Sequence, residues 1–209
     1  MKFRRKHDAV SSSDEAEVTD EEMEPTPGPY DADDLPEDGV ERVDLGSLLI
    51  QPEQGRELRL QVDEASGNVH SVMLAGQDGA LELRAFAAPR NGDLWSEVRP
   101  QIAADMAQRG GTATEREGRF GTELLCEVQV KRNDGGTVMQ PSRIVGINGP
   151  RWLLRATFLG RPVEPDRAED WEDTVTKVAV RRGAQAMPVG EPLPVILPEQ
   201  ARPVSPTQD

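Results

Sequence analysis

The sequence has a single cysteine, Cys126, and two histidines, His7 and His70. One cysteine cannot form an internal disulfide, and such scarcity is typical of a reducing compartment, so we expect a cytoplasmic location. Two histidines so far apart in the sequence disfavour a histidine-dependent metal site, a Ser-His-Asp triad and a Cys-His dyad. We therefore expect no catalytic, cofactor-binding or metal-binding residues, and we expect Cys126 to be a small buried residue of a strand.

Aromatic residues and long apolar runs are also scarce. Aromatic side chains make up 4% of the chain, and no apolar run approaches the ~20 residues that a membrane span requires. The net charge is −14 and the pI is about 4.6. Binding to nucleic acid needs a basic face for the phosphates, so this composition disfavours it. The nucleotide-binding motifs GxGxxG and GxxxxGK(S/T) are missing, so the sequence gives no support for nucleotide binding. The basic residues at the start of the chain are followed by acidic rather than apolar residues, so we expect no secretory signal.

Acidic residues are concentrated near the amino terminus of the sequence. Asp8 to Asp38 holds 13 carboxylates and no Lys or Arg; with four basic residues ahead of it, residues 1–38 carry −9, and the rest of the chain carries −5. This stretch has too few apolar residues to offset the entropy of ordering, so we expect a disordered acidic tail. Thr19 lies among the carboxylates and is a candidate phosphorylation site, whose modified form would bind an arginine-bearing partner surface. The alternative is a tail that only solvates the protein.

The carboxyl-terminal part of the sequence is rich in proline rather than in acidic residues. Residues 184–209 contain six prolines, which exclude a helix and favour a polyproline-like extended tail. Between the two tails lie residues 39–183. A domain of that size can bury a core without disulfides or metal, so we expect one folded domain there.

Signals within this domain alternate between strands and turns, with two helical stretches. Apolar alternation predicts strands at about 42–50, 57–62, 69–74, 80–87, 113–118, 123–130, 138–147 and 151–159. One helix follows Asp93, ends at Gly110-Gly111, and contains Pro100, which should kink it or mark its true start; the other spans about 168–178. Since no βαβ repetition appears, we predict an α+β domain, a mainly antiparallel sheet with helices packed on it.

The segment from Arg143 to Gly160 gives the clearest pattern. Asn148-Gly149 predicts a hairpin turn, and Pro150 suits the first residue of the next strand. One face of that strand is wholly apolar, whereas the other mixes leucines with Arg151 and Arg155, so we expect an interior strand covered on both sides, by helices. The two arginines then form either structural ion pairs near the sheet rim or a contact for an anion or partner.

Four strings of the sequence, in their order and spacing, resemble an uncharacterised actinobacterial family, domain of unknown function 3710. The strings are Asp38–Leu48, Ala85–Arg90 with Leu94-Trp95, Phe120–Leu124 and Gly149–Arg155. The resemblance covers about residues 38–197 and implies no activity, because the family has none assigned. A weaker likeness, of topology only, is to the sheet with flanking helices of the photosystem protein PsbP and its relatives, which mostly bind partners or scaffold complexes; likeness of fold does not imply function.

These observations favour a non-catalytic cytoplasmic protein-interaction or scaffold protein. The candidate contacts to an unknown protein partner are Arg151, Arg155, Trp95 if it is exposed, and the acidic tail. The alternative is a domain that binds a small anionic or apolar ligand between sheet and helix, which would show a concave apolar cavity where a scaffold would not. An enzyme is the third hypothesis, because acid–base chemistry would rest on carboxylates and arginines without histidine.

Overall fold

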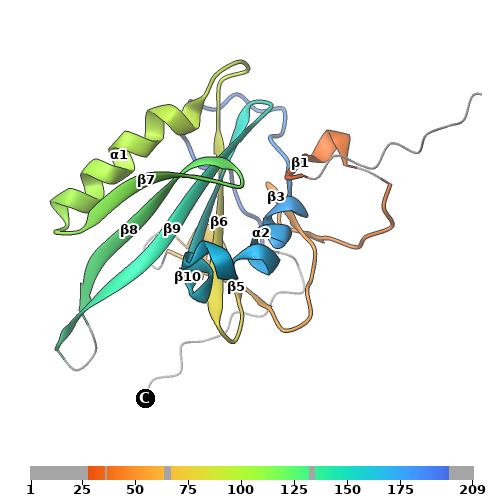
Figure 1. The fold of residues 1–209 in the computed structure, drawn as a ribbon. Helices are drawn as coiled ribbons and strands as arrows, with labels where there is room; N and C mark the ends of the chain where they lie inside the picture. Colours follow the sequence, from red (N-terminus) through yellow and green to blue (C-terminus); the bar gives the residue numbers. More distant parts are fainter. Residues whose placement is uncertain (1–27, 36, 64–66, 132–134, 198–209) are drawn as a thin grey trace, which may run out of the picture.

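The computed structural model describes residues 28–35, 37–63, 67–131 and 135–197, which form two sheets and two α-helices (Figure 1). The larger sheet has seven strands in the order β4 (Glu57–Val62), β5 (Val69–Ala75), β6 (Gly79–Ala87), β10 (Trp152–Gly160), β9 (Thr137–Gly149), β8 (Gly121–Lys131) and β7 (Thr112–Gly118). The smaller sheet has the order β1 (Tyr30–Asp31), β11 (Ala179–Val180), β3 (Leu48–Ile50) and β2 (Val43–Asp44). The helices are α1 (Leu94–Gln108) and α2 (Glu169–Thr176), with short 3₁₀ helices η1 (Ala32–Asp34), η2 (Arg161–Val163) and η3 (Pro165–Arg167).

The predicted α+β class is confirmed. Every pair of neighbouring strands in the seven-stranded sheet is antiparallel, and β4, β5 and β6 form the expected meander. The smaller sheet is mixed, because β1 runs parallel to β11. The single strand expected over 42–50 is instead two short strands, β2 and β3, which pair with each other across a turn. Gly46 lies in this turn with φ of 80°, a conformation that glycine adopts without strain.

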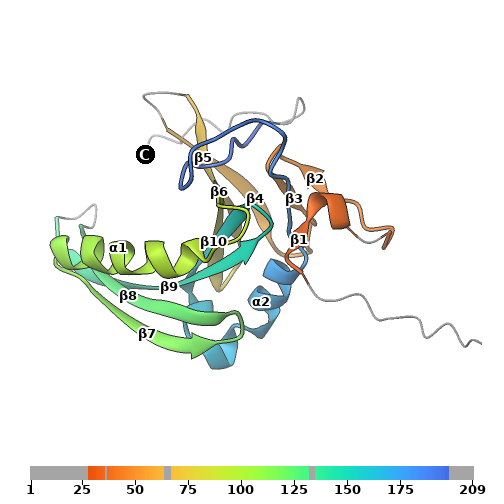
Figure 2. The same ribbon diagram turned by 90° about the horizontal axis from the view of Figure 1, so that it is seen from above.

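Different elements cover the two sides of the large sheet, as Figure 2 shows from above. On one side α1 packs over β7, β8 and β9. On the other side lie α2 and the smaller sheet, and the main core fills the space between them and the sheet. The apolar face predicted for β10 belongs to this main core, through Trp152, Leu154, Ala156 and Phe158. Its second face is covered by α1 only at Leu153, so the expectation of helices over both faces holds for part of the strand.

Helix α1 begins where the sequence predicts. The side chain of Asp93 accepts a hydrogen bond from the backbone N–H of Ser96 (3.0 Å) and so caps the helix. The helix runs through Pro100 without interruption, so Pro100 does not mark its start. The backbone N–H of Gly111 returns to the carbonyl of Met106 (2.8 Å), which closes the last turn.

The folded part extends beyond the predicted domain at both ends. Tyr30 and Asp31 form β1, and Asp31 accepts a hydrogen bond from Nε1 of Trp152 (2.8 Å), so placing these residues in a disordered tail is wrong. At the other end, the segment Glu191–Val195 runs along β6 and bridges to Val69 of β5. Strand β5 pairs with β6 only as far as Leu83, and beyond Leu83 this segment lies beside β6 in place of β5. The part of the predicted Pro-rich tail from Glu191 to Val195 is therefore bound to the domain.

Candidate functional site

Arg84 on β6 and Arg155 on β10 lie directly opposite each other in the large sheet. Side chains in such positions have Cβ atoms about 5 Å apart, and like charges there repel. We call these two residues the arginine pair. The sheet therefore places two guanidinium groups side by side on one surface.

In the described part of the chain, no carboxylate forms an ion pair with either arginine, and the Nε atoms of both are buried without a hydrogen-bond partner. Burial is the main cause that lowers the pKa of Arg155, and the charge of Arg84 lowers this pKa further. The charge of Glu82 acts in the opposite direction. Arginine stays protonated at neutral pH even so. The surface thus holds two adjacent positive charges that the surrounding protein leaves without a direct counter-ion.

Phe86, two residues after Arg84 on the same side of β6, contacts both guanidinium groups. The Cζ atoms of Arg84 and Arg155 are each 5.3 Å from the centre of its ring. A cation near an aromatic face gains about 0.5–1 kcal/mol at a partly exposed position, which offsets part of the repulsion between the arginines. Both arginines are only partly buried, and their Nη atoms, unlike their Nε atoms, are not among the fully buried atoms without a hydrogen-bond partner.

The arginine pair borders the area that α1 covers. Arg155 is opposite Gly146 of β9, and the ring of Trp95 from α1 rests on Gly146, where a Cβ atom would overlap it. Beyond this point the side chains on the same side of β6 and β10 are only partly buried. We call this surface the arginine face; it comprises Glu82, Arg84, Phe86, Arg155 and Thr157.

Trp95 does not contribute to an exposed surface. Its side chain is 4% exposed, and its Nε1 donates to the carbonyl of Thr122 (2.6 Å). Its backbone N–H donates to the side chain of Asn148 (3.2 Å), which holds the start of α1 against β9. The prediction that Trp95 contacts a partner depended on exposure, and it is wrong for this reason.

Arg151 lies apart from Arg155 rather than on the same strand face. The turn between β9 and β10 consists of Pro150 and Arg151, not of Asn148-Gly149, and Trp152 pairs with Gly149. Arg151 has φ of 63°, and its carbonyl accepts from the N–H of Ala88 (2.9 Å). The predicted pairing of Arg151 and Arg155 on one face is therefore wrong, and Arg84 takes the position next to Arg155.

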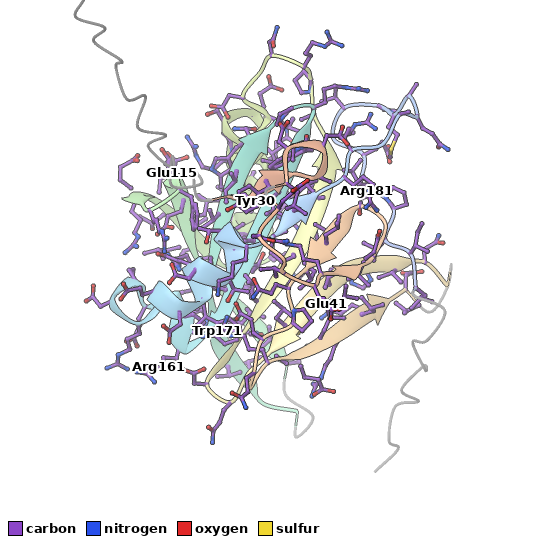
Figure 3. The ribbon with its side chains drawn as sticks, turned by 90° about the vertical axis from the view of Figure 1, so that its right-hand side faces the viewer. Tyr30, Glu41, Glu115, Arg161, Trp171 and Arg181 are labelled. Atoms are coloured by element: carbon purple, nitrogen blue, oxygen red, sulfur yellow. The ribbon has the colours of Figure 1, made fainter. Side chains whose placement is uncertain are left out.

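Two hollows lie away from the arginine face; Figure 3 labels Arg161 and Trp171 of one and Arg181 of the other. One, of about 320 Å³, lies between α2 and the loops before β4 and β6; it contains Arg161 and Trp171, whose ring Arg56 covers at 4.0 Å. The other, of about 350 Å³, lies beside Arg181 and the residues after β11. Both are open to solvent, and neither includes a residue of the arginine face.

A second concentration of charge is enclosed in the protein, and its charges form ion pairs with one another. Nη1 of Arg143, which has no exposed surface, donates to Glu172 of α2 (2.6 Å) and to Glu123 of β8 (3.2 Å). Arg116 donates to the other oxygen of Glu123 (2.6 Å). Because each carboxylate has an arginine partner, this cluster joins α2 to the sheet and offers no open binding position.

The remaining candidates have ordinary places in the structure. Cys126 is buried on β8, and burial raises the pKa of its thiol, which disfavours a reactive thiolate. His70 is exposed on β5. Within the described ranges, no group of His, Cys, Asp or Glu side chains could hold a metal ion, and no helix is long and apolar enough to cross a membrane. Thr19 lies outside the described residues.

Arg84 was missed in the sequence. Its strand was predicted correctly, and alternation places Glu82, Arg84 and Phe86 on one side of β6. The signal that singles out Arg84 is its register with Arg155, and this depends on the pairing of two strands about 70 residues apart, which alternation does not determine.

Comparison with known proteins gives one family match. The family model described as "Protein of unknown function (DUF3710)" matches residues 28–203, which confirms the resemblance drawn from the four strings. No curated protein matches the sequence. Among solved structures, a crystal structure from Bacteroides thetaiotaomicron VPI-5482 is similar with 11% sequence identity and a TM-score of 0.39, over 70% of this chain. The match covers 49% of that chain, so this protein spans about half the length of the solved structure.

Proposed function

This chain belongs to the DUF3710 family of proteins of unknown function, and from that premise we propose that it is a non-catalytic binding protein whose arginine face binds an acidic segment of a protein partner. The observation that carries the proposal is the direct opposition of Arg84 and Arg155 without a carboxylate partner in the described part of the chain.

The chemistry of the pair suits a carboxylate. A guanidinium group presents its N–H donors in a planar fork that matches the two oxygens of a carboxylate, and such charge-assisted hydrogen bonds are stronger than neutral ones. A carboxylate placed between Arg84 and Arg155 would accept from the Nη atoms and would remove the repulsion between the two cations. The ring of Phe86 adds an apolar contact for the stem of an Asp or Glu side chain.

The shape of the surface favours a chain segment over a small molecule. Small ligands bind in concave pockets that bury most of their surface. The arginine face is part of a sheet surface, and neither of the two hollows described above includes a residue of it. A partner that covers such a surface gains area by extending along it, as a peptide does.

The proposal includes a cytoplasmic location and the absence of catalytic activity. Cys126 is a free thiol in the core, which suits a reducing compartment. Among the described residues, the two buried carboxylates, Glu123 and Glu172, are both paired with arginines, which supports a structural role for them.

A fluorescent Glu-rich peptide, titrated by anisotropy, tests the proposal. We expect Arg84→Gln and Arg155→Gln each to weaken binding by about tenfold or more, because each removes charge-assisted hydrogen bonds. Arg90→Gln is the matched control, since Arg90 is exposed and has no ion pair in the described residues, and it should change affinity little. Thermal unfolding of each variant confirms that it is folded.

Two results would overturn this function. One is an affinity for the peptide that neither Arg84→Gln nor Arg155→Gln changes. The other is displacement of the peptide by inorganic phosphate at concentrations too low to act through ionic strength, which would favour a small anion as the natural ligand.

A further inference from the structure

We infer that the acidic segment 8–27 of the same molecule occupies the arginine face when no partner is bound. This inference rests on the proposed function, because it names a first occupant of the same surface. It makes the amino-terminal segment a built-in competitor that a partner has to displace.

The charge of the segment complements the face. Residues 8–27 contain no Lys or Arg. Their eight carboxylates are Asp8, Asp14, Glu15, Glu17, Asp20, Glu21, Glu22 and Glu24. Two cations held side by side attract a run of anions more strongly than one does, and the burial of their Nε atoms reduces screening by water.

The arginine pair is the place on the described surface that such a segment fits best. The arginines without an ion pair among the described residues are Arg84, Arg90, Arg109, Arg151, Arg155 and Arg182. Of these, only Arg84 and Arg155 are opposite each other in the sheet. Arg182 also has a buried Nε, but its Nη1 already donates to the carbonyl of Gln185 (3.0 Å).

Two carboxylates at the start of the domain already have hydrogen-bond partners within it. Asp31 accepts from Trp152, and Asp38 accepts from Arg42 (2.7 Å). Hydrogen bonds from Arg42 and from the N–H of Val40 lower the pKa of Asp38 to about 2. These contacts fix the start of the domain and leave the more distal carboxylates of the segment for the arginine face.

The segment is long enough to reach either side of the domain. It precedes Gly28, which lies beside the carbonyl of Thr176 at the end of α2. Extended chain spans about 3.3 Å per residue, so ten to twenty residues cover roughly 33–66 Å. A domain of about 170 residues has a radius of gyration of about 15 Å, and a tethered segment acts at an effective concentration on the order of millimolar. Intramolecular binding therefore needs only a weak intrinsic affinity.

The same arrangement predicts how phosphorylation of Thr19 would act. Thr19 precedes Asp20, Glu21 and Glu22, and a phosphate there would add about −1.5 to −2 charges to the segment. Phosphorylation would therefore strengthen occupation of the arginine face and weaken competing partners.

The experiment compares the native full-length chain with a tail-neutral full-length chain. The tail-neutral chain carries D14N, E15Q, E17Q, D20N, E21Q, E22Q and E24Q. The control chain carries E41Q, D105N and D166N, three changes at exposed positions of the domain that also reduce the negative charge. Two readouts are recorded: affinity for the fluorescent Glu-rich peptide, and NMR signals of the arginine Nε–Hε groups, assigned with Arg84→Gln and Arg155→Gln.

We expect the tail-neutral chain to bind the peptide about fivefold or more tightly than the native chain, because the competitor is gone. Without peptide, the Arg84 and Arg155 signals should differ between native and tail-neutral chains, independently of protein concentration, and the control chain should match the native one. Equal affinities and unchanged signals would overturn the inference and leave the proposed function intact. Signal changes that grow with protein concentration would place the contact between molecules and overturn it too. If neither chain binds the peptide, the proposed function itself fails.

Discussion

Nη1 of Arg143 donates to Oε1 of Glu172 at 2.6 Å, and this bond joins the middle of β9 to helix α2 inside the core. The same nitrogen reaches Glu123 of β8, and the guanidinium lies 4.2 Å from the ring centre of Phe158. Its Nε and Nη2 atoms have no hydrogen-bond partner. The group is therefore a buried cation whose stability depends on two carboxylates and one ring.

Arg143→Met should lower the free energy of unfolding by about 3 kcal/mol, since removing one member of a buried ion cluster leaves charge that is no longer compensated. Glu123 would retain Arg116, but Glu172 would retain only Arg119, at 4.0 Å. Urea denaturation measures the loss. The double variant Arg143→Met/Glu172→Met should recover part of it, because the orphaned carboxylate is gone.

The exposed pair of Arg167 and Glu164 provides a control for this prediction. Their side chains are 55% and 63% exposed, so Arg167→Met should cost less than about 1 kcal/mol. A loss from Arg143→Met no greater than that of Arg167→Met would contradict the structural role given to the cluster.

Arg151→Gly should stabilise the protein. Arg151 has φ of 63°, and a residue with a side chain at positive φ costs about 1 kcal/mol relative to glycine. Pro150 before it fits a type II turn, in which glycine is the usual next residue. We expect the unfolding midpoint in urea to rise by an amount that corresponds to about 1 kcal/mol. Arg90→Gly, in a loop without positive φ, should not stabilise; equal shifts in both variants would show that the backbone of Arg151 is unstrained.

Gly146→Ala should destabilise the junction of α1 with the sheet. A Cβ atom at this position would overlap the ring of Trp95, and overpacking of this kind costs about 1–3 kcal/mol. Trp95→Leu in the Gly146→Ala background should recover part of the loss, because the smaller side chain gives room. Additive losses in the double variant, measured by urea denaturation, would show that the two positions do not interact.

Strands and helices of this fold could be predicted because their signals are local. The alternation in β6 and β10, and Asp93 before α1, mark elements that the structure contains. The turn between β9 and β10 could not be predicted correctly, since Asn148-Gly149 resembles a hairpin turn. Gly149 is instead required within the strand, because the ring of Trp152 covers it and leaves no room for a Cβ atom.

The candidate site could be predicted only in part, for a related reason. Arg155 stands out in the sequence as a charge on an otherwise apolar strand, but its importance depends on Arg84, and their opposition is a property of strand register. In the same way, nothing local indicates that Glu191–Val195 lies along β6. Contacts between distant segments decide both features, and periodicity carries no information about them.

Glu53, in the loop between β3 and β4, should make stability depend on pH. Burial acts to raise the pKa of its carboxyl, but hydrogen bonds from Lys177 (2.9 Å), Thr174 (2.8 Å) and Arg56 outweigh burial and hold the pKa below its usual value. A carboxyl whose pKa is lower in the folded than in the unfolded state stabilises the fold above the unfolded pKa. That contribution is lost as the pH falls through the folded pKa.

Glu53→Gln should therefore be destabilising at neutral pH, by about 1 kcal/mol after allowance for solvent screening, and the difference from the native chain should shrink as the pH falls below about 4. Urea denaturation at a series of pH values measures this convergence. Glu41→Gln, at an exposed position without an ion pair in the described residues, is the control and should parallel the native chain throughout. A constant difference between native and Glu53→Gln chains across the acid range would show that the carboxylate charge does not hold this loop to α2.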